Sequence, residues 1–529
     1  MAALGAGASA RPVISNVVTS SHVPPRKGSA GAGAAASERR SGTRNSIGRA
    51  AQYSDAGHVD CTRGGSLKTI ATCAALVAAL AIGPARAGEF FAAPAGNARG
   101  DGSRERPWDL ATALGARGRI SSGDTVWLRG GTYTGTFTAK LAGTRATPIV
   151  VRGHPGERVT IDGSLHLAGA FAWYRDFEIM SSARTRRSRE SGPYPKDVPR
   201  GDLSTVEGPE TGAGLKVIDV VAHDLASVML WKEAVDMEVE GCLVYYNGWT
   251  APDRGHGHGI YVQNVSGTKR IAGNVIFRNF DNGIQAYGSE KAGLDNLDIE
   301  GNTIFGNGDL IEDPANNILI GGGRVAENPR VVDNLLYFSA FARGIQINLG
   351  YDPYGVGASR AKVTGNYLGN GEIRMNDRNR DVAFERNTVF SAPAHFDARR
   401  YPENVYPSSR PARSRVFVRP DPYARGRAIV TVFNWARQPW VEADLSAVLA
   451  RGQRFEVRDA QDYFGVPIST ATWSGAPLRL PMKARPPAVP IGWKRPAPTG
   501  PDFNVFVIVP AMREKGEARG SLDAVSAGR

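Results

Sequence analysis

The sequence predicts an all-β protein whose main part is a parallel β-helix solenoid, between an N-terminal cap and a small C-terminal β-sandwich-like module. A small residue, an asparagine and a short apolar strand recur at Asn274, Asn302, Asn334, Asn366 and Asn387, with spacings of 28, 32, 32 and 21 residues. Self-similarity at this period is typical of solenoids. Because no helical periodicity separates these strands, the repeat predicts coils of parallel β-strands.

A second strand follows in each coil, and its side chains alternate as expected for a strand with one buried face. With Ile260 placed inward, the inward pairs are all apolar: Val228/Leu230, Ile260/Val262, Ile284/Ala286, Ile318/Ile320, Ile345/Ile347 and Ile373/Met375. The outward pairs are mostly polar or aromatic: Met229/Trp231, Tyr261/Gln263, Gln285/Tyr287, Leu319/Gly321, Gln346/Asn348 and Arg374/Asn376. This outward set is the predicted floor of a binding groove.

The recurring asparagines are predicted to be structural. Asparagine tolerates tight corners and bonds neighbouring backbone, and amides stacked at strand spacing can bond one another along the solenoid. Cys242 occupies the same position in its coil and is predicted to be a small buried filler.

The N-terminal part is not expected to belong to the solenoid. Residues 1–66 are rich in Ala, Gly, Ser and Arg, which indicates a disordered extension or a start codon placed too far upstream. Residues 67–87 combine Lys68, an apolar run over 70–82 and an Ala-Arg-Ala site, which predicts a secretory signal peptide. The alternative is a disordered tail with a chance apolar patch. Export would place the protein in the periplasm or outside the cell.

Charge and cysteine content fit this interpretation. Of the net charge of +13, residues 1–87 contribute ten Lys/Arg and three Asp/Glu, or +7, which leaves +6 for the rest. A moderately basic surface suits an acidic polymer, and no sequence pattern of a nucleic-acid-binding module is present. After removal of the signal only Cys242 remains, so no intrachain disulfide is expected.

The other segments follow in order. Residues 88–165 are predicted to form the N-terminal cap and first coils, and residues 166–400 the β-helix. Residues 411–512 alternate with period two between Pro/Gly turns, which indicates the C-terminal β module, with a role in sugar binding or in packing. Residues 513–529 are predicted to be a flexible tail.

Long loops flank the second strand on both sides. The insertions before it span 247–258 and 307–316, those after it span 288–294 and 349–360, and a further arginine-rich loop spans 182–212. Insertions that map to one face of a repeat array usually build its binding surface.

The segment Gly255-His256-Gly257-His258-Gly259 carries the densest group of reactive side chains. Small neighbours let both imidazoles approach a ligand, and Asp253 or Asp281 could assist a histidine. The alternatives are histidines that cap a turn, a zinc site for which no third ligand is fixed, and aspartates that only stabilise turns.

Sugar contacts are expected from the outward face. Aromatic rings offer flat faces to pyranose rings, and amides bond pairs of hydroxyl groups. The candidate substrate-binding residues are Trp231, Gln263, Gln285, Tyr287, Gln346 and Asn348.

Residues 88–400 resemble exported right-handed β-helix proteins related to polysaccharide lyases and uronan C5-epimerases. The resemblance is carried by AAPAGNARGDGSRERPW, GDTVWLRGGTY, GHGHGIYVQN (255–264), GIQAYG (283–288) and NILIGGG (317–323). It implies β-elimination on a uronate polymer, in which a base removes the C5 proton, an acid protonates the leaving oxygen and a cation neutralises the carboxylate. The residues that fit these roles are His258 or His256 as base, Tyr261 as proton donor, Lys232 as neutralising cation, and Arg343 and Arg374 at outer subsites.

The leading hypothesis is therefore a monomeric, exported polysaccharide lyase. A C5-epimerase would use similar groups, a glycoside hydrolase would need two facing carboxylates, and a binding or adhesion solenoid would need no base. Lys232 could instead be a solvated strand end. No cofactor is required by the pattern, although Asp309, Glu312 and Asp313 could hold Ca²⁺ or belong to a solvated loop.

Overall fold

The computed structural model describes residues 87–511 apart from 116–117, 314, 340–343, 352 and 391–396. The predicted extension, nearly all of the predicted signal peptide, the C-terminal tail and Arg343 lie outside the described residues. Among the residues that are described, no helix is long and apolar enough to cross a membrane.

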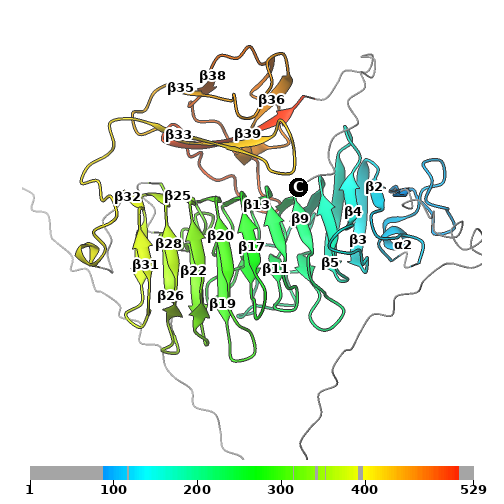
Figure 1. Cartoon of the computed structure of the whole chain (residues 1–529), viewed down its shortest axis with the longest axis horizontal. Helices are drawn as coiled ribbons and strands as arrows, with labels where there is room; N and C mark the ends of the chain where they lie inside the picture. Colours follow the sequence, from blue (N-terminus) through cyan, green and yellow to red (C-terminus); the bar gives the residue numbers. More distant parts are fainter. Residues whose placement is uncertain are drawn as a thin grey trace, which may run out of the picture. The chain divides into compact units, whose positions relative to one another are not determined.

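The main body is a parallel β-helix, as predicted (Figure 1). Its coils stack three columns of parallel strands. The first column contains β1 (Glu89–Ala92), β2 (Thr125–Leu128), β4 (Ile149–Gly153), β6 (Ala172–Arg175), β9 (Lys216–Ile218), β12 (Glu238–Glu240), β17 (Lys269–Ala272), β20 (Leu297–Glu300), β24 (Arg330–Val332), β28 (Lys362–Thr364) and β31 (Ala383–Glu385).

The second column follows the asparagine corner in each coil. It contains β7 (Glu178–Met180), β10 (Val221–His223), β13 (Leu243–Tyr245), β18 (Val275–Phe277), β21 (Thr303–Phe305), β25 (Leu335–Tyr337), β29 (Tyr367–Gly369) and β32 (Thr388–Phe390).

The third column is the second strand of the sequence repeat. It contains β8 (Leu203–Thr205), β11 (Val228–Leu230), β16 (Ile260–Val262), β19 (Ile284–Gly288), β22 (Asn316–Gly322), β26 (Ile345–Tyr351) and β30 (Glu372–Met375). In the first coils the long strands β3 (Gly131–Ala139) and β5 (Val159–Leu167) span the second and third columns. Strand β5 pairs with β7 of the second column and with β8 of the third, and β3 pairs with β5 along its whole length.

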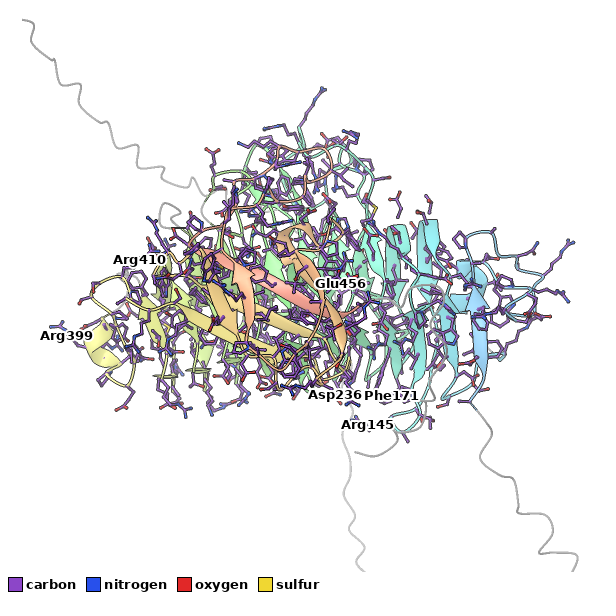
Figure 2. The ribbon with its side chains drawn as sticks, turned by 90° about the horizontal axis from the view of Figure 1, so that it is seen from above. Arg145, Phe171, Asp236, Arg399, Arg410 and Glu456 are labelled. Atoms are coloured by element: carbon purple, nitrogen blue, oxygen red, sulfur yellow. The ribbon has the colours of Figure 1, made fainter. Side chains whose placement is uncertain are left out.

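A few elements lie outside these columns. In the N-terminal region, helix α2 (Leu110–Gly115) buries Leu110, Ala113 and Leu114. Two small ribbons and two 3₁₀ turns complete the chain: β14 (Trp249–Thr250) with β15 (Gly255–His256), β23 (Ala326–Glu327) with β27 (Ala358–Ser359), η1 (Ala398–Arg400) and η2 (Ala460–Asp462). Arg145, in the loop after β3, donates to Asp236 at 3.2 Å and lies over the ring of Phe171, so it links separate coils (Figure 2).

The apolar interior follows the predicted alternation in most coils. The inward residues of β11, β16, β19 and β22 are buried in one continuous cluster. In β26 Ile347 faces the core as predicted, but its partner there is Leu349 and not Ile345, so the predicted inward pair is half wrong. The register of β26 is irregular between Ile345 and Ile347, which shifts the inward set by two residues.

The asparagine ladder is present as predicted. Each corner amide donates to the next one, from Asn274 through Asn302, Asn334 and Asn366 to Asn387, at 2.9–3.0 Å. The ladder extends one rung further to Asn404, and Cys242 begins it because its N–H donates to Asn274 at 2.9 Å. A row of such bonds satisfies the buried corner groups of successive coils.

The C-terminal module pairs antiparallel strands, in contrast to the β-helix. Its five-stranded sheet has the order β33 (Arg415–Pro420), β34 (Ala428–Phe433), β39 (Phe503–Pro510), β36 (Arg454–Asp459) and β37 (Ser469–Thr472), and a second pair is formed by β35 (Trp440–Ala443) and β38 (Leu478–Pro481).

This module packs on the outer face of the second column, called here the docking face (Figure 1). Rings stack along that face at strand spacing: Tyr245 on Phe277 at 4.8 Å, and Phe277 on Phe305 at 4.9 Å. Phe503 of β39 stacks on Tyr337 at 4.3 Å. The docking face is thus closed by the chain itself, and the outer face of the third column is not part of this contact.

Candidate functional site

The candidate site begins at the ribbon β14–β15, which leads directly into β16 of the third column. Trp249 pairs with His256 and Thr250 with Gly255, so the insertion folds into a tight antiparallel hairpin. Gly257 then turns with φ of +79°, and a Cβ there would lie 2.3 Å from the backbone of Gly248. Glycine is therefore required between the two histidines, and it places them in different environments.

His256 does not meet the prediction of a substrate-facing base. Its side chain is 2% exposed and stacks on Trp249 at 5.6 Å. One ring nitrogen, Nε2, lies 3.0 Å from Oδ1 of Asp253. Burial lowers the pKa of His256, and the hydrogen bond with Asp253 opposes that shift. His256 therefore stabilises the hairpin through the side chains of Asp253 and Trp249.

Nδ1 of His258 is buried and has no hydrogen-bond partner among the described residues. Its side chain is 11% exposed, and Nδ1 lies 3.7 Å from Oδ2 of Asp281. This separation is longer than a hydrogen bond but close enough for one to form after a small movement. Burial lowers the pKa of His258 to about 3, and the charge of Arg254 adds to that effect. His258 is consequently a neutral imidazole at neutral pH.

Asp281 also resists ionisation. Burial raises the pKa of Asp281 to about 7, while the charge of Arg254 opposes the shift. Nη1 of Arg254 donates to Oδ2 of Asp281 at 2.5 Å, and the guanidinium is 46% exposed. The site thus combines a neutral imidazole, a carboxyl group that titrates near neutrality and an accessible cation.

Aromatic residues continue the site along the outer face. Tyr261 stacks on His258 at 6.1 Å and contacts Trp231 at 5.5 Å. The hydroxyl of Tyr261 accepts a bond from Gln263 at 2.9 Å and donates to the carbonyl of Tyr287 at 3.3 Å. Burial raises the pKa of Tyr261, so the phenol keeps its proton at neutral pH. The predicted neighbourhood of Trp231, Tyr261, Gln263 and Tyr287 is therefore present.

A row of hydrogen-bonded amide side chains runs from Gln285 across the following coils. Asn282 donates to Gln285 at 2.6 Å, Asn316 donates to Asn282 at 2.7 Å, and Asn348 donates to Asn316 at 3.1 Å. Gln285 is half-buried, but Asn348 is only 7% exposed. Gln285 can therefore offer its remaining amide protons to a ligand, while Asn348 mainly holds the row of side chains in place.

Gln346 is not part of the groove floor, contrary to the prediction. Its side chain is fully buried, accepts from Asn317 at 2.7 Å and donates to the carbonyl of Gly369 at 2.9 Å. It ends a second internal amide ladder that passes through Asn279, Asn307 and Asn317. These buried amide bonds and the irregular register of β26 turn Gln346 away from solvent, so it cannot contact a substrate here.

Lys232 is not brought to the reaction centre. It follows the end of β11, whereas His258 precedes β16, and the two strands are paired in register. Its amine donates to the carbonyl of Lys291 at 2.8 Å. Arg254, and not Lys232, is the cation beside His258 and Asp281. Arg374 lies further along the outer face, in register with Asn348 and paired with Glu372 at 3.1 Å.

The proposed Ca²⁺ ligands do not converge. Within the part of the chain that the structure describes, no three His, Cys, Asp or Glu side chains are arranged to hold a metal ion. Glu312 pairs with Lys494 at 3.2 Å, and Asp309 is half-buried near Arg278, with desolvation as the main cause of its raised pKa. These residues do not fit a calcium site, so the side chains of the chain itself must supply the acid, base and cation of the candidate site.

Sequence reasoning missed the roles of Arg254 and Asn282. Arg254 was visible two residues before His256, but its bond to Asp281 depends on how the 249–256 hairpin folds back on the next coil. Asn282 belongs to an Asn-Gly-Ile pattern that also predicts a simple turn.

No family model matches the chain. A pectate lyase, PEL9 of Emericella nidulans, is 35% identical over 79 residues, or 15% of this chain and 19% of that protein. The chain thus matches about a fifth of the length of this curated relative.

Two of the solved structures with similarity to the chain are named as lyases. Pectate lyase Pel9A has a TM-score of 0.39 and 16% identity, covering 62% of this chain and 82% of its own. A rhamnogalacturonan lyase has a TM-score of 0.41 and 14% identity, covering 58% and 87%. The parallel β-helix itself rests on the strand pairing of this chain.

Proposed function

We propose that this protein is a polysaccharide lyase that cleaves a uronate-containing polysaccharide by β-elimination, in the periplasm or outside the cell. The observation that carries the proposal is the neutral imidazole of His258, whose Nδ1 lies 3.7 Å from the carboxyl group of Asp281. The partial sequence match to a pectate lyase supports the same reaction class.

In the proposed reaction, His258 is the general base. Nδ1 faces Asp281, so Nε2 is the nitrogen that would accept the C5 proton of the uronate. The electron pair of the broken C5–H bond forms the C4–C5 double bond as the C4–O4 bond breaks. The imidazolium that results lies beside Asp281, whose ionised carboxylate stabilises the new charge.

Tyr261 is the proposed general acid. It keeps its proton because burial raises its pKa, and its ring stacks on that of His258 at 6.1 Å. Transfer of the phenolic proton to O4 completes the cleavage. Arg254 would neutralise the uronate carboxylate, which lowers the cost of removing the C5 proton.

The test is incubation of the protein with a panel of uronate polymers while the ultraviolet absorbance of the C4–C5 double bond is followed. Elimination gives a rising absorbance together with new reducing ends. New reducing ends without absorbance would indicate hydrolysis, inversion at C5 without cleavage would indicate an epimerase, and binding with no product would indicate an adhesion protein. Any of these last three results would overturn the proposal.

A further inference from the structure

A second candidate binding region lies away from His258, between the β-helix and the C-terminal segment. It is a cavity of about 1100 Å³ lined by residues of 184–187, 310–312 and 489–494 together with Thr250. Four separate parts of the chain therefore contribute to its walls. A volume of this size is sufficient for a sugar unit.

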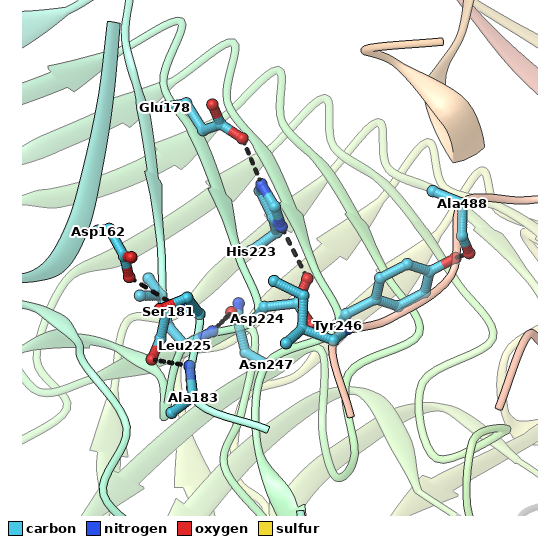
Figure 3. A network of polar contacts seen from close by, with 12 residues as sticks. Asp162, Glu178, Ser181, Ala183, His223, Asp224, Leu225, Tyr246, Asn247 and Ala488 are labelled. Atoms are coloured by element: carbon cyan, nitrogen blue, oxygen red, sulfur yellow. Dashed lines mark hydrogen bonds and ion pairs between the residues drawn. The ribbon is translucent and has the colours of Figure 1, made fainter. Parts of the chain in front are cut away.

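The back of the cavity is held by a buried ion pair. Arg186 is 1% exposed and pairs through Nη2 with Oδ1 of Asp224. Arg186 also donates to the carbonyls of Gly248 at 2.6 Å and Ile491 at 2.9 Å, and the N–H of Ile491 donates to Asp224 at 2.9 Å. Asp224 further contacts Nδ1 of His223 (Figure 3).

These bonds fix the C-terminal segment on the β-helix. At Ala488, the residue before this segment, the backbone carbonyl accepts a hydrogen bond from the hydroxyl of Tyr246 at 3.0 Å (Figure 3). On its other side, Nε1 of Trp493 donates to the carbonyl of Leu310 at 3.0 Å. The walls are thus in place before any ligand binds, which reduces the ordering cost of binding.

The charge on the walls is unbalanced. Arg184, Arg187 and Lys494 are exposed cations, whereas Glu312 is the acidic residue among the lining residues, and it pairs with Lys494 at 3.2 Å. Three exposed cations against one carboxylate leave an excess of two positive charges. The buried charge of Arg186 is balanced by Asp224 and does not add to this excess. A surface with an excess of positive charge attracts anions.

The positions of the arginines suit a carboxylate. The guanidinium of Arg187 lies 4.6 Å from the ring centre of Trp493, which orients it. Arginine binds carboxylates through two parallel N–H bonds, a geometry that lysine cannot reproduce. The ribbon β14–β15 connects this region to the reaction centre, since Thr250 lines the cavity and Arg254, in the turn of the same ribbon, bonds Asp281.

We propose that this cavity binds a carboxylate-bearing sugar unit of an acidic polysaccharide, outside the reaction centre. The class of ligand rests on the function proposed above. Arg184 and Arg187 bind the carboxylate, and the segment 489–494 of the C-terminal region supplies the opposite wall. The C-terminal region would therefore contribute to substrate binding as well as to the closure of the docking face.

The test uses the full-length protein and the double variant R184A/R187A. Calorimetric binding of an acidic oligouronate is compared with binding of the same oligosaccharide after reduction of its carboxyl groups. We expect the double variant to bind the acidic ligand about tenfold more weakly, as expected for the loss of charge-assisted bonds. KM for the polymer rises similarly, with kcat unchanged. Arg399→Ala, an arginine that is 90% exposed and paired with Asp397, is the matched control.

The outcomes separate this inference from the proposed function. If the protein cleaves a uronate polymer and KM is the same in wild type and R184A/R187A, the cavity proposal is wrong while the lyase proposal stands. If no polymer is cleaved but the double variant loses binding of the acidic ligand, the cavity proposal stands alone. If wild-type protein binds the acidic and the reduced oligosaccharides equally, or binds neither, the cavity proposal is overturned.

Discussion

Nδ1 of His258 lies 3.7 Å from Oδ2 of Asp281, and burial disfavours the charged form of each group, which lowers the pKa of His258 to about 3 and raises the pKa of Asp281 to about 7. The two residues come from successive coils, and the hairpin that carries His258 also supplies Arg254 to the same carboxyl group. This arrangement gives the site a base whose activity depends on the ionisation of its neighbour.

The rate of cleavage is expected to rise with pH around neutrality. Asp281 is protonated below its pKa of about 7 and cannot then stabilise the imidazolium of His258. Above that pKa the carboxylate is present, so kcat/KM increases between about pH 6 and about pH 8. The pH profile of kcat/KM measures this. Asp281→Asn should be slow and should lack the rise near pH 7; an unchanged profile in that variant would exclude Asp281 from the reaction.

Tyr261→Phe should separate acid catalysis from packing. The variant keeps the ring that contacts His258 and Trp231 but removes the hydroxyl group. We expect kcat to fall by about 10²- to 10⁴-fold, as is typical for the loss of a general acid. Tyr406→Phe, which removes a hydroxyl bonded to the carbonyl of Tyr401, is the control. Full activity of the Tyr261 variant would assign the proton donor elsewhere.

Asp224→Ala should loosen the contact between the C-terminal segment and the β-helix. It leaves the buried guanidinium of Arg186 without its carboxylate, which costs about 3 kcal/mol or more in the free energy of unfolding. Denaturant unfolding measures the loss. Removal of the exposed ion pair in Asp397→Ala should lower the free energy of unfolding far less, because solvent screens the two charges. Equal losses in both variants would contradict the role given to the buried pair.

Asn334→Ala should destabilise the β-helix and leave the candidate site intact, because Asn334 does not contact that site. The side chain accepts from Asn302 and donates to Asn366 and to the carbonyl of Ile299. Its removal leaves several buried polar groups unpaired, at about 1–3 kcal/mol for each unsatisfied group. Thermal unfolding should occur at a clearly lower temperature, while KM of the folded protein stays the same. A variant as stable as wild type would refute a structural ladder.

The repeat made much of this fold predictable from the sequence. The asparagine positions and the alternation in β11, β16, β19 and β22 depend on local chain geometry, so they could be derived residue by residue. The shift in β26 could not, because it depends on a buried bond between Gln346 and Asn317 of another coil.

The candidate site was less predictable for the same reason. The sequence placed His256 and His258 together, but glycine between them and the stacking of His256 on Trp249 give them different roles. Lys232 directly follows Trp231 in the chain, but the pairing of β11 with β16 places it at the strand end far from His258. Arg254 reaches Asp281 only through the fold of the hairpin.

His258 is the residue expected to remove the C5 proton from a uronate. The most direct measurement compares wild type, His258→Ala and the control His154→Ala in the elimination assay, with thermal unfolding to confirm that each variant folds. We expect wild type and His154→Ala to form the unsaturated product at similar rates, and His258→Ala to be slower by about 10²-fold or more. A folded His258→Ala protein that forms the product at the wild-type rate would contradict the account.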